Sequence, residues 1–533
     1  MKTAISCWLV LCVALAVNAH AQILPPHQSS NPWYQDARQA LTQKPNLQAN
    51  LKAKNVILFI GDGMGVSTIT AARILDGQNK GHAGEENQLS FEAFPFTGLS
   101  KTYNVDAQTP DSAGTMTAII SGVKTDAGVI GIDENVIRGN CQTVAGHELV
   151  TTLDLAELAG MATGFVTTTR VTHATPAALY AKSPERNWED NSDLPEAAIA
   201  AGCSDIAAQL IDYESRLKKH YSKAKHIDGI EVVMGGGRRH FLPSSPEFNS
   251  PDATSDIEGD RNDDRHLINE WQQRYPDGAY VYDKAGFDLI DPSSAQQVFA
   301  LFDESHMHYE ADRHNDQAGE PSLSEMTTKA LTILKQREEG FFLMVEAGRI
   351  DHAHHAGNAY NALNDTIELS NAVKQAIAHT DPAETLIVVT ADHSHVFTMA
   401  GYPKRGNPIL GKVVNVGEVE PAKAADGKPY TTLAYANGLG FRHHHDETDA
   451  DTAYAEPAKS GRTNLTDIDT EQTGYHQEAL VPLSAETHGG EDVAVYATGP
   501  GAEGVLGVNE QNLIFHVINQ AAQLEQRAIA TMQ

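Results

Sequence analysis

Short apolar runs recur along the chain, and stretches with hydrophobic positions at helical spacing separate them. The runs are nearly continuous in Val, Ile, Leu and Phe, which is typical of strands buried on both faces of a parallel sheet. They are Asn55–Ile60, Thr163–Thr168, Glu231–Met234, Phe341–Val345, Thr385–Val389 and Asp492–Tyr496. The helical patterns are Val66–Leu75, Gly114–Ile120, Ser324–Lys335 and Asn358–Ile377. The alternation predicts an α/β fold, with a large central, mostly parallel β-sheet flanked by helices on both faces.

Two regions depart from this pattern. Residues Asn249–Arg265 are rich in Asp, Ser, Asn and Gly, which predicts a surface loop. Residues 400–479 are polar with little periodicity, and we interpret them as a long insertion before the last strands, returning to the sheet at Pro482. The insertion contains His443-His444-His445, for which a solvated surface patch is the preferred interpretation over a metal site.

The N-terminus has the features of a secretory signal. Met1-Lys2 precedes an apolar run and the small-residue site Ala19-His20-Ala21. Cleavage after Ala21 would remove residues 1–21 and leave a mature chain of residues 22–533; an uncleaved anchor is the less favoured alternative. Downstream, no stretch of about 18 apolar residues occurs, so we expect no membrane span and a periplasmic or secreted location.

Cysteine content and charge narrow the possibilities further. Cys7 and Cys12 lie in the signal, which leaves Cys141 and Cys203 either to pair in an oxidising compartment or to remain as two separate buried thiols. The formal net charge of −31 argues against a nucleic-acid partner. An anionic substrate would require a local concentration of metal cations or arginine.

Three of the predicted strands end in acidic residues. Asp62, Glu346 and Asp392 stand at or directly after their carboxyl ends, beside Gly, Ala or His. Because the carboxyl ends of parallel strands are where ligands bind, these side chains are expected to converge. A single such residue is often a helix cap, but three clustered carboxylates would repel one another and raise their pKa values. Bound metal ions resolve this repulsion.

Histidines near these acids supply nitrogen ligands. Asp351 and His355 are four residues apart, and so share one face if their segment is helical. His393 follows Asp392 directly, and His488 precedes the last predicted strand. A single histidine is more often a satisfied or solvent-facing side chain. As a set placed after strand ends, however, they favour zinc, which accepts mixed oxygen and nitrogen ligands.

Ser112 is the candidate nucleophile. It lies in Thr109-Pro110-Asp111-Ser112-Ala113-Gly114, a run of small residues that predicts the first turn of a helix, where backbone N–H groups attract anions. A serine at this position is commonly a helix N-cap. Beside a zinc ion, its hydroxyl could instead be deprotonated and made reactive.

Several motifs resemble those of the alkaline phosphatase family, occur in that family's order and span about Lys54 to Ile518. They are Gly61-Asp62-Gly63-Met64-Gly65, Asp111-Ser112-Ala113, His173-Ala174-Thr175-Pro176-Ala177, Met234-Gly235-Gly236-Gly237-Arg238, Thr390-Ala391-Asp392-His393 and Thr487-His488-Gly489. The resemblance implies hydrolysis of a broad range of phosphate monoesters through a phosphoserine on Ser112. It also implies a homodimer and a crown-like insertion at about 400–479.

The resemblance further implies a set of site residues. Two Zn²⁺ ions would be held, the first by Asp351, His355 and His488, the second by Asp62, Asp392 and His393 with Ser112 facing it. One Mg²⁺ would be held by Asp62, Thr175 and Glu346. Arg186 would bind phosphate. His173 and His352 stand near the third metal where the best-known bacterial members carry Asp and Lys, and here the chain is similar to the vertebrate members.

Two other kinds of enzyme and one non-catalytic class of protein are alternatives to an alkaline phosphatase. Sulfatases need a Cys-x-Pro-x-Arg run that neither Cys141 nor Cys203 provides. Phosphodiesterases with the same type of fold are the nearest enzymatic alternative, as a secondary activity. A non-catalytic zinc- or phosphate-binding protein of the periplasm is the alternative from another class, and such a protein would have no turnover for Ser112→Ala to remove.

Overall fold

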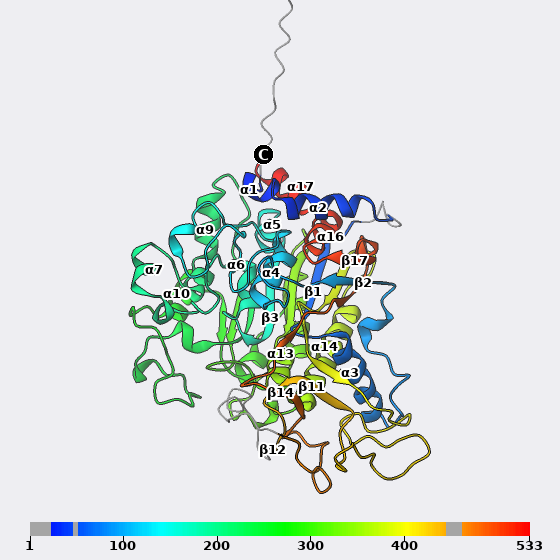
Figure 1. Ribbon diagram of the computed structural model, residues 1–533. Coiled ribbons are helices and arrows are strands. Elements are labelled where there is room, and N and C mark those ends of the chain that lie inside the picture. The colour runs from blue at the N-terminus through cyan, green and yellow to red at the C-terminus, as the bar shows by residue number, and fades with distance from the viewer. Residues whose placement is uncertain (1–22, 46–51, 444–460) are drawn as a thin grey trace, which may run out of the picture.

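A computed structural model describes residues 23–45, 52–443 and 461–533 (Figure 1). The expected signal at residues 1–21, together with His444 and His445, lies outside the described residues. In the described part, ten strands form one sheet in the order β17-β2-β16-β8-β1-β7-β3-β4-β6-β5. From that edge, the strands are Gly507–Glu510, Phe96–Lys101, Val493–Thr498, Thr385–Thr390, Asn55–Gly61, Phe341–Ala347, Ala162–Arg170, Val232–Gly236, Val298–Leu301 and Ala279–Val281.

The α/β prediction is confirmed, and each of the six predicted strands is present in this sheet. The strands from β8 to β5 are mutually parallel. One prediction was wrong in direction. Strand β16, expected to be parallel, runs antiparallel to both β8 and β2. An apolar run indicates burial on both faces but carries no information about strand direction.

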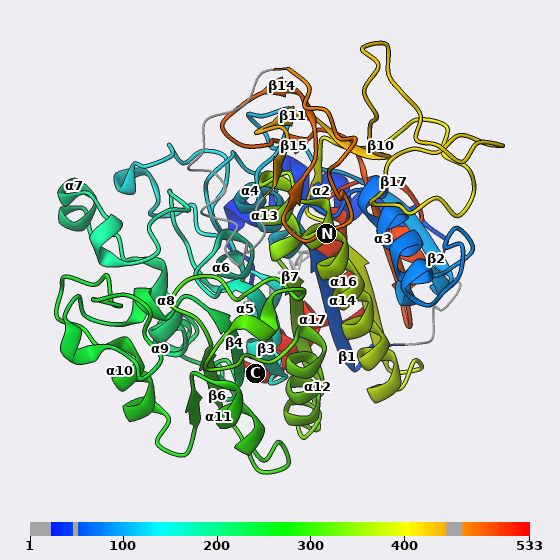
Figure 2. The ribbon, with the colours of Figure 1, turned by 90° about the horizontal axis from the view of Figure 1, so that it is seen from below.

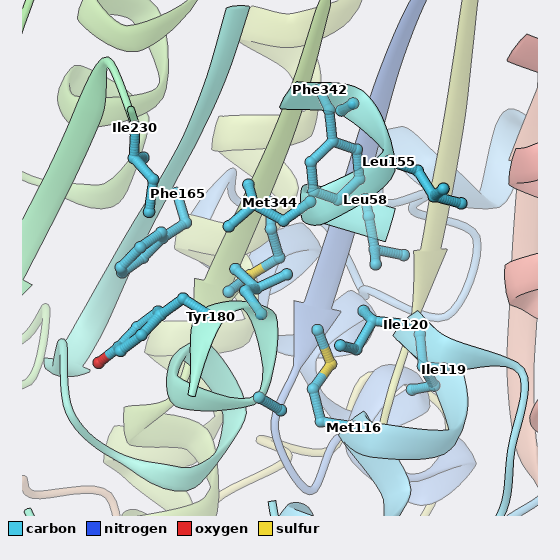
Figure 3. Close-up of a cluster of buried hydrophobic side chains, with 14 of the residues drawn as sticks. Leu58, Met116, Ile119, Ile120, Leu155, Phe165, Tyr180, Ile230, Phe342 and Met344 are labelled. Atoms are coloured by element: carbon cyan, nitrogen blue, oxygen red, sulfur yellow. The ribbon is translucent and has the colours of Figure 1, made fainter. Parts of the chain in front are cut away.

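Helices cover both faces of the sheet, and alternate side chains of each strand contact them. In β1, Leu58 packs with helices α4 (Ser112–Ser121), α5 (Thr152–Leu158), α6 (Ala174–Tyr180) and α16 (Leu513–Ala522). Phe59 faces the opposite cluster, formed with α3 (Val66–Asn79), α12 (Leu323–Leu334) and α14 (Ala359–His379). Figure 3 shows the first cluster, in which Met116 and Ile119 of α4 lie beneath the sheet near Leu58. The helix that begins at Ser112 is thereby fixed against the central strands.

The insertion forms a small structure at the carboxyl end of the strands. Its sheet comprises β10 (Phe397–Met399), β11 (Leu433–Gly438) and β14 (Ala479–Pro482). A two-residue ladder joins β9 (Ser394–His395) to β15 (His488–Gly489). In Figure 2, β11, β14 and β15 lie near α4 and α13 (Arg349–His355). The expected return at Pro482 was wrong, because Pro482 ends β14 and the chain rejoins the large sheet at Val493.

Three further predictions can be compared with the structure. Residues Asn249–Arg265 contain no helix or strand, as expected of a loop, yet Glu258 and Arg261 within them are buried. Cys141 and Cys203 form a disulfide, which decides between the two alternatives for these thiols. Among the described residues, no helix has the length and apolar character needed to cross a bilayer.

Candidate metal centre and nucleophile

The three strand-end acids lie side by side on adjacent strands. Ile60 of β1 pairs with Glu346 of β7 and with Thr390 of β8, which places Asp62, Glu346 and Asp392 at the same edge of the sheet. All three are fully buried. Burial raises the pKa of Asp62 well above its ordinary value, and repulsion from Asp392 and other nearby carboxylates raises it further. A nearby cation would relieve this cost by stabilising the ionised form.

Asp351, His355 and His488 form the first cluster of possible ligands. The Nε2 atoms of His355 and His488 are 3.0 Å apart, and each lies 3.3 Å from Asp351 Oδ1. Nδ1 of His355 donates to the carbonyl of Glu486, and Nδ1 of His488 donates to the carbonyl of Pro110, both at 2.7 Å. In a neutral imidazole, a protonated Nδ1 leaves a lone pair on Nε2. Two lone pairs and a carboxylate oxygen therefore converge on one point.

This cluster fits zinc in both donor type and spacing. Ligand atoms about 2.0 Å from a tetrahedral zinc ion lie about 3.3 Å from one another, which agrees with the distances of 3.0 to 3.3 Å within the cluster. The backbone carbonyls that hold the Nδ1 atoms provide the second hydrogen bond that metal-binding histidines normally make. Helix α13 places Asp351 and His355 one turn apart, as their spacing predicted.

A second cluster surrounds the hydroxyl of Ser112. His393 Nε2 lies 3.0 Å from Ser112 Oγ, 3.3 Å from Asp62 Oδ1 and 3.5 Å from Asp392 Oδ2. Ser112 Oγ is also 3.4 Å from Asp62 Oδ1. The two clusters adjoin, since the rings of His393 and His488 stack with centroids 3.6 Å apart. A hydroxyl beside two carboxylates and an imidazole is where a zinc ion would lower the pKa of serine.

The third group contains Asp62, Glu346, Thr175 and His173. Donor atoms of Asp62, His173 and Glu346 lie within 4.8 Å of one another, and Thr175 Oγ1 is 3.5 Å from Asp62 Oδ2. Glu346 Oε2 accepts from Thr167 and Thr169, whereas its buried Oε1 has no hydrogen-bond partner among the described residues. Burial is the main cause that raises the pKa of Glu346 to about 8. An unpaired, buried carboxylate oxygen fits a hard cation such as magnesium.

Helix α4 presents Ser112 at its first position, and Asp111 is its N-cap. Asp111 Oδ1 accepts from the Gly114 backbone N–H, and Oδ2 accepts from the Gly128 backbone N–H and from Arg186 Nη1 at 3.1 Å. Burial tends to raise the pKa of Asp111, but Arg186 and these N–H groups lower it below its ordinary value. Arg186 is thus held on the carboxylate next to Ser112, and its Nη2 lies 3.2 Å from His173 Nε2.

His173 and His352 lie close together, with ring centroids 5.4 Å apart. A third imidazole, which the sequence did not bring to attention, completes their group: the His306 ring is 4.1 Å from that of His352 and 5.4 Å from that of His173. His306 follows β6 after a short turn, and no regular spacing connects it to His173 or His352 in the sequence.

Two other residues were missed near the first cluster. His395 Nε2 lies 2.8 Å from Asp351 Oδ1, and its Nδ1 lies 2.6 Å from Glu486 Oε2. A signal for His395 existed, because it stands two residues after His393 at the end of a predicted strand, a spacing that can return a side chain to the same region. The same spacing marks Glu486, which stands two residues before His488.

Comparisons with known proteins show the family to which the chain belongs. A family model described as alkaline phosphatase matches residues 53–524. The tissue-nonspecific alkaline phosphatase isozyme of Gallus gallus is 43% identical over 515 residues, which covers 94% of this chain and 91% of that protein. The isozyme of Homo sapiens is 40% identical over 526 residues, covering 97% and 93%. The Thermus thermophilus alkaline phosphatase structure, at 22% identity and a TM-score of 0.61, covers 96% of this chain and 99% of its own and shares the fold.

Proposed function

We propose that this chain, which belongs to the alkaline phosphatase family and is a phosphoric monoester hydrolase, acts through a covalent phosphoserine on Ser112. The observation that carries the proposal is the position of Ser112 Oγ, 3.0 Å from His393 Nε2 and 3.4 Å from Asp62 Oδ1 at the start of α4. Ser112 is buried, with 2% of the residue exposed.

We further propose the identities of the metal ions. Two Zn²⁺ would be held by the first and second clusters, and one Mg²⁺ by Asp62, Thr175 and Glu346. When bound, these ions polarise the phosphoryl oxygens and lower the pKa of the serine hydroxyl. The support is the donor set: imidazole nitrogens with carboxylates suit zinc, and an oxygen-only set suits magnesium. His173 and His352 would act from outside this ligand set, through hydrogen bonding and charge near the third ion.

The residues of the chain would divide the reaction between them. Ser112 Oγ attacks phosphorus in line, the Oγ–P bond forms, and the bond from phosphorus to the alcohol oxygen breaks. Arg186, held by Asp111, binds two phosphoryl oxygens with its planar fork, and the N-terminal end of α4 stabilises their charge. The alcohol oxygen leaves with its bonding electron pair and takes up the proton that Ser112 lost. Water then attacks phosphorus, the Oγ–P bond breaks, one proton of that water returns to Ser112 Oγ, and phosphate leaves. These contacts are all made to the phosphoryl group, so broad monoester specificity is expected.

Substitution of the nucleophile tests the proposal. Ser112→Ala should lose most of its turnover of a chromogenic phosphomonoester, by about 10³-fold or more, while retaining its bound metal. Brief reaction of the parent with labelled substrate followed by acid quenching should leave label on the peptide that contains Ser112. A Ser112→Ala variant with parental turnover would overturn the assignment of the nucleophile. A steep preference for a single alcohol would contradict the expected broad specificity.

The cellular location and assembly are also proposals. Export to the periplasm or outside the cell is supported by the signal-like residues 1–21 and by the Cys141–Cys203 disulfide, since such bonds persist in oxidising compartments. N-terminal sequencing of the mature protein should begin at Gln22. A homodimer, expected from the family resemblance, should give twice the mass of the processed chain in light scattering.

A further inference from the structure

Glu486 lies just outside the proposed ligands of the first zinc ion and contacts this set by two routes. Its backbone carbonyl accepts a hydrogen bond from His355 Nδ1 at 2.7 Å. Its carboxylate Oε2 lies 2.6 Å from His395 Nδ1, while Oε1 accepts from the Val396 backbone N–H at 2.8 Å. The residue is 2% exposed, so these contacts are made away from water. One side chain and its own carbonyl therefore engage two different partners around the same centre.

The second route continues through His395 to a proposed ligand. His395 Nε2 lies 2.8 Å from Asp351 Oδ1, the oxygen that also faces the Nε2 atoms of His355 and His488. His395 is itself 3% exposed and is fixed by the ladder between β9 and β15, in which it pairs with His488. The contacts Glu486–His395–Asp351 thus connect a carboxylate outside the proposed ligand set to one proposed ligand oxygen.

We propose that Glu486 is a positioning residue for the first zinc site, which orients His355 through its carbonyl and Asp351 through its carboxylate and His395. This inference rests on the proposed function, because it takes Asp351, His355 and His488 as zinc ligands. Partners outside the ligand set that orient ligands typically change metal affinity by about 10- to 100-fold when they are removed.

Glu486 also connects this site to the insertion. Gly438, at the end of β11, has φ +132°, and an added Cβ would lie 3.1 Å from Glu486 Cβ. Next to it, the side chain of Asn437 forms two hydrogen bonds with Thr487, at 2.9 and 3.0 Å. Thr487 stands between Glu486 and His488, so the small sheet of the insertion holds the segment that bears both residues. The small sheet of the insertion therefore contacts the segment that bears Glu486 and His488.

A purely structural role for Glu486 makes a different prediction from a positioning role. A buried carboxylate that only stabilises the fold would, when replaced, lower stability and activity alike at every zinc concentration. A residue that positions zinc ligands would instead shift the zinc dependence, and high zinc would restore turnover. The two roles are therefore distinguished by zinc titration.

The experiment compares Glu486→Gln with the parent enzyme in zinc-buffered solutions. Glutamine keeps the volume and can still accept from Val396 N–H, but it lacks the charge that holds His395. We expect the free zinc concentration for half-maximal activity to rise about 10- to 100-fold, with kcat at saturating zinc within about threefold of the parent. The visible spectrum of the Co²⁺-substituted protein should change, because it reports ligand geometry.

Glu157→Gln is the matched control. Glu157 is also a fully buried carboxylate, but it lies at the amino end of the strands, beside Thr163. Its replacement should leave both the zinc dependence and the cobalt spectrum at parental values. If Glu486→Gln does not fold, Glu486→Asp keeps the charge but withdraws it by one methylene, and should shift the zinc dependence in the same direction.

The outcomes separate this inference from the proposed function. A zinc dependence and cobalt spectrum unchanged in Glu486→Gln, or in Glu486→Asp where that variant is used, would overturn the positioning role. A loss of turnover that zinc does not restore would do the same. If the parent itself bound no zinc, or Ser112→Ala retained full turnover, the proposed function would fail instead.

Discussion

The sheet buries acidic side chains at both ends of its strands, and the two ends compensate for them differently. At the carboxyl end, the buried acids lie beside histidines, and the Nε2 atoms of His355 and His488 face them with lone pairs. These acids are Asp62, Glu346, Asp351 and Asp392. At the amino end, Glu157 and Glu231 accept hydrogen bonds from the hydroxyl and backbone N–H of Thr163. Arg337 donates to Glu231 from outside.

The two ends differ in the hydrogen-bond donors and acceptors that surround the buried acids. At the amino end, Glu157 and Glu231 can be compensated by protonation and by hydrogen-bond donors, because the neighbouring hydroxyl, backbone N–H and guanidinium groups all donate to them. At the carboxyl end, donors reach only some of the carboxylate oxygens: Thr167 and Thr169 donate to Glu346 Oε2, but its buried Oε1 has no partner among the described residues. The Nε2 atoms of His355 and His488 add lone pairs there. The carboxyl end therefore suits a cation, whereas the amino-end pair suits protonation.

Removal of metal should have the largest effect. Exhaustive chelation should abolish phosphomonoester turnover, and should also lower the midpoint of thermal unfolding, because carboxylates are left facing one another. A ligand present at about 1,000 times its Kd stabilises the folded state by about 4 kcal/mol, which sets the scale of the loss. Calorimetry before and after chelation, followed by zinc and magnesium addition, measures it. An enzyme that kept its activity and its unfolding midpoint without metal would contradict the proposal that metal ions compensate the carboxyl-end acids.

Removal of the proposed phosphate-binding arginine should have the next largest effect on activity. Arg186→Ala should lower kcat/KM about 30- to 100-fold and raise the Ki for inorganic phosphate, because it loses a charge-assisted hydrogen-bonded pair of about 2 to 3 kcal/mol.

Arg337→Ala is the matched control for Arg186, since Arg337 also pairs with acids, Asp228 and Glu231, but at the amino end. It should leave the phosphate Ki unchanged. Equal effects of the two substitutions on Ki would show that Arg186 has no special role in binding phosphate.

The amino-end pair should produce the smallest effect, and one that depends on pH. Burial, followed by repulsion from Asp228, raises the pKa of Glu231 to about 7. Burial and repulsion from Glu231 also raise the pKa of Glu157 well above its ordinary value. The pKa of each carboxyl in the folded state exceeds the unfolded-state value of about 4.3. The stability that protonation of the pair contributes is therefore fully present below about pH 4.3. It is lost as pH rises through about 7, the folded-state pKa of Glu231.

Glu157→Gln should therefore gain stability at alkaline pH. Glutamine removes one charge from the ionised pair, so at pH 9 the free energy of unfolding should exceed that of the parent by about 1 to 2 kcal/mol. At pH 5, where the parent pair is protonated, the difference should be within about 0.5 kcal/mol. Urea unfolding with metals present measures both values, and a constant difference across this pH range would contradict protonation as the compensating mechanism.

The central strands of the sheet could be predicted from the sequence, because burial on both faces gives them a continuous apolar pattern. Buried parallel strands such as β1, β7 and β8 are continuously apolar, so the acids that end them are conspicuous. The four-residue spacing of Asp351 and His355 likewise becomes one face of α13.

The contacts that orient these residues were not predictable from local pattern. The Asp111–Arg186 ion pair joins residues 75 apart, and the hydrogen bond from His395 to Glu486 joins residues 91 apart. Edge strands such as β17 are short and partly exposed, and so lack the apolar run that marked the centre. The antiparallel direction of β16 depends on how the chain returns from the insertion, which periodicity does not encode.

The central claim is that the carboxyl-end acids and histidines gather two zinc ions beside Ser112. X-ray diffraction from crystals of the purified enzyme, with anomalous data collected on both sides of the zinc absorption edge, tests it most directly. The account predicts one zinc peak among Asp351, His355 and His488, and a second among Asp62, Asp392 and His393 within contact of Ser112 Oγ. No zinc peak at either position, or zinc bound only at a separate group such as Asp190, Asp193 and His240, would contradict it.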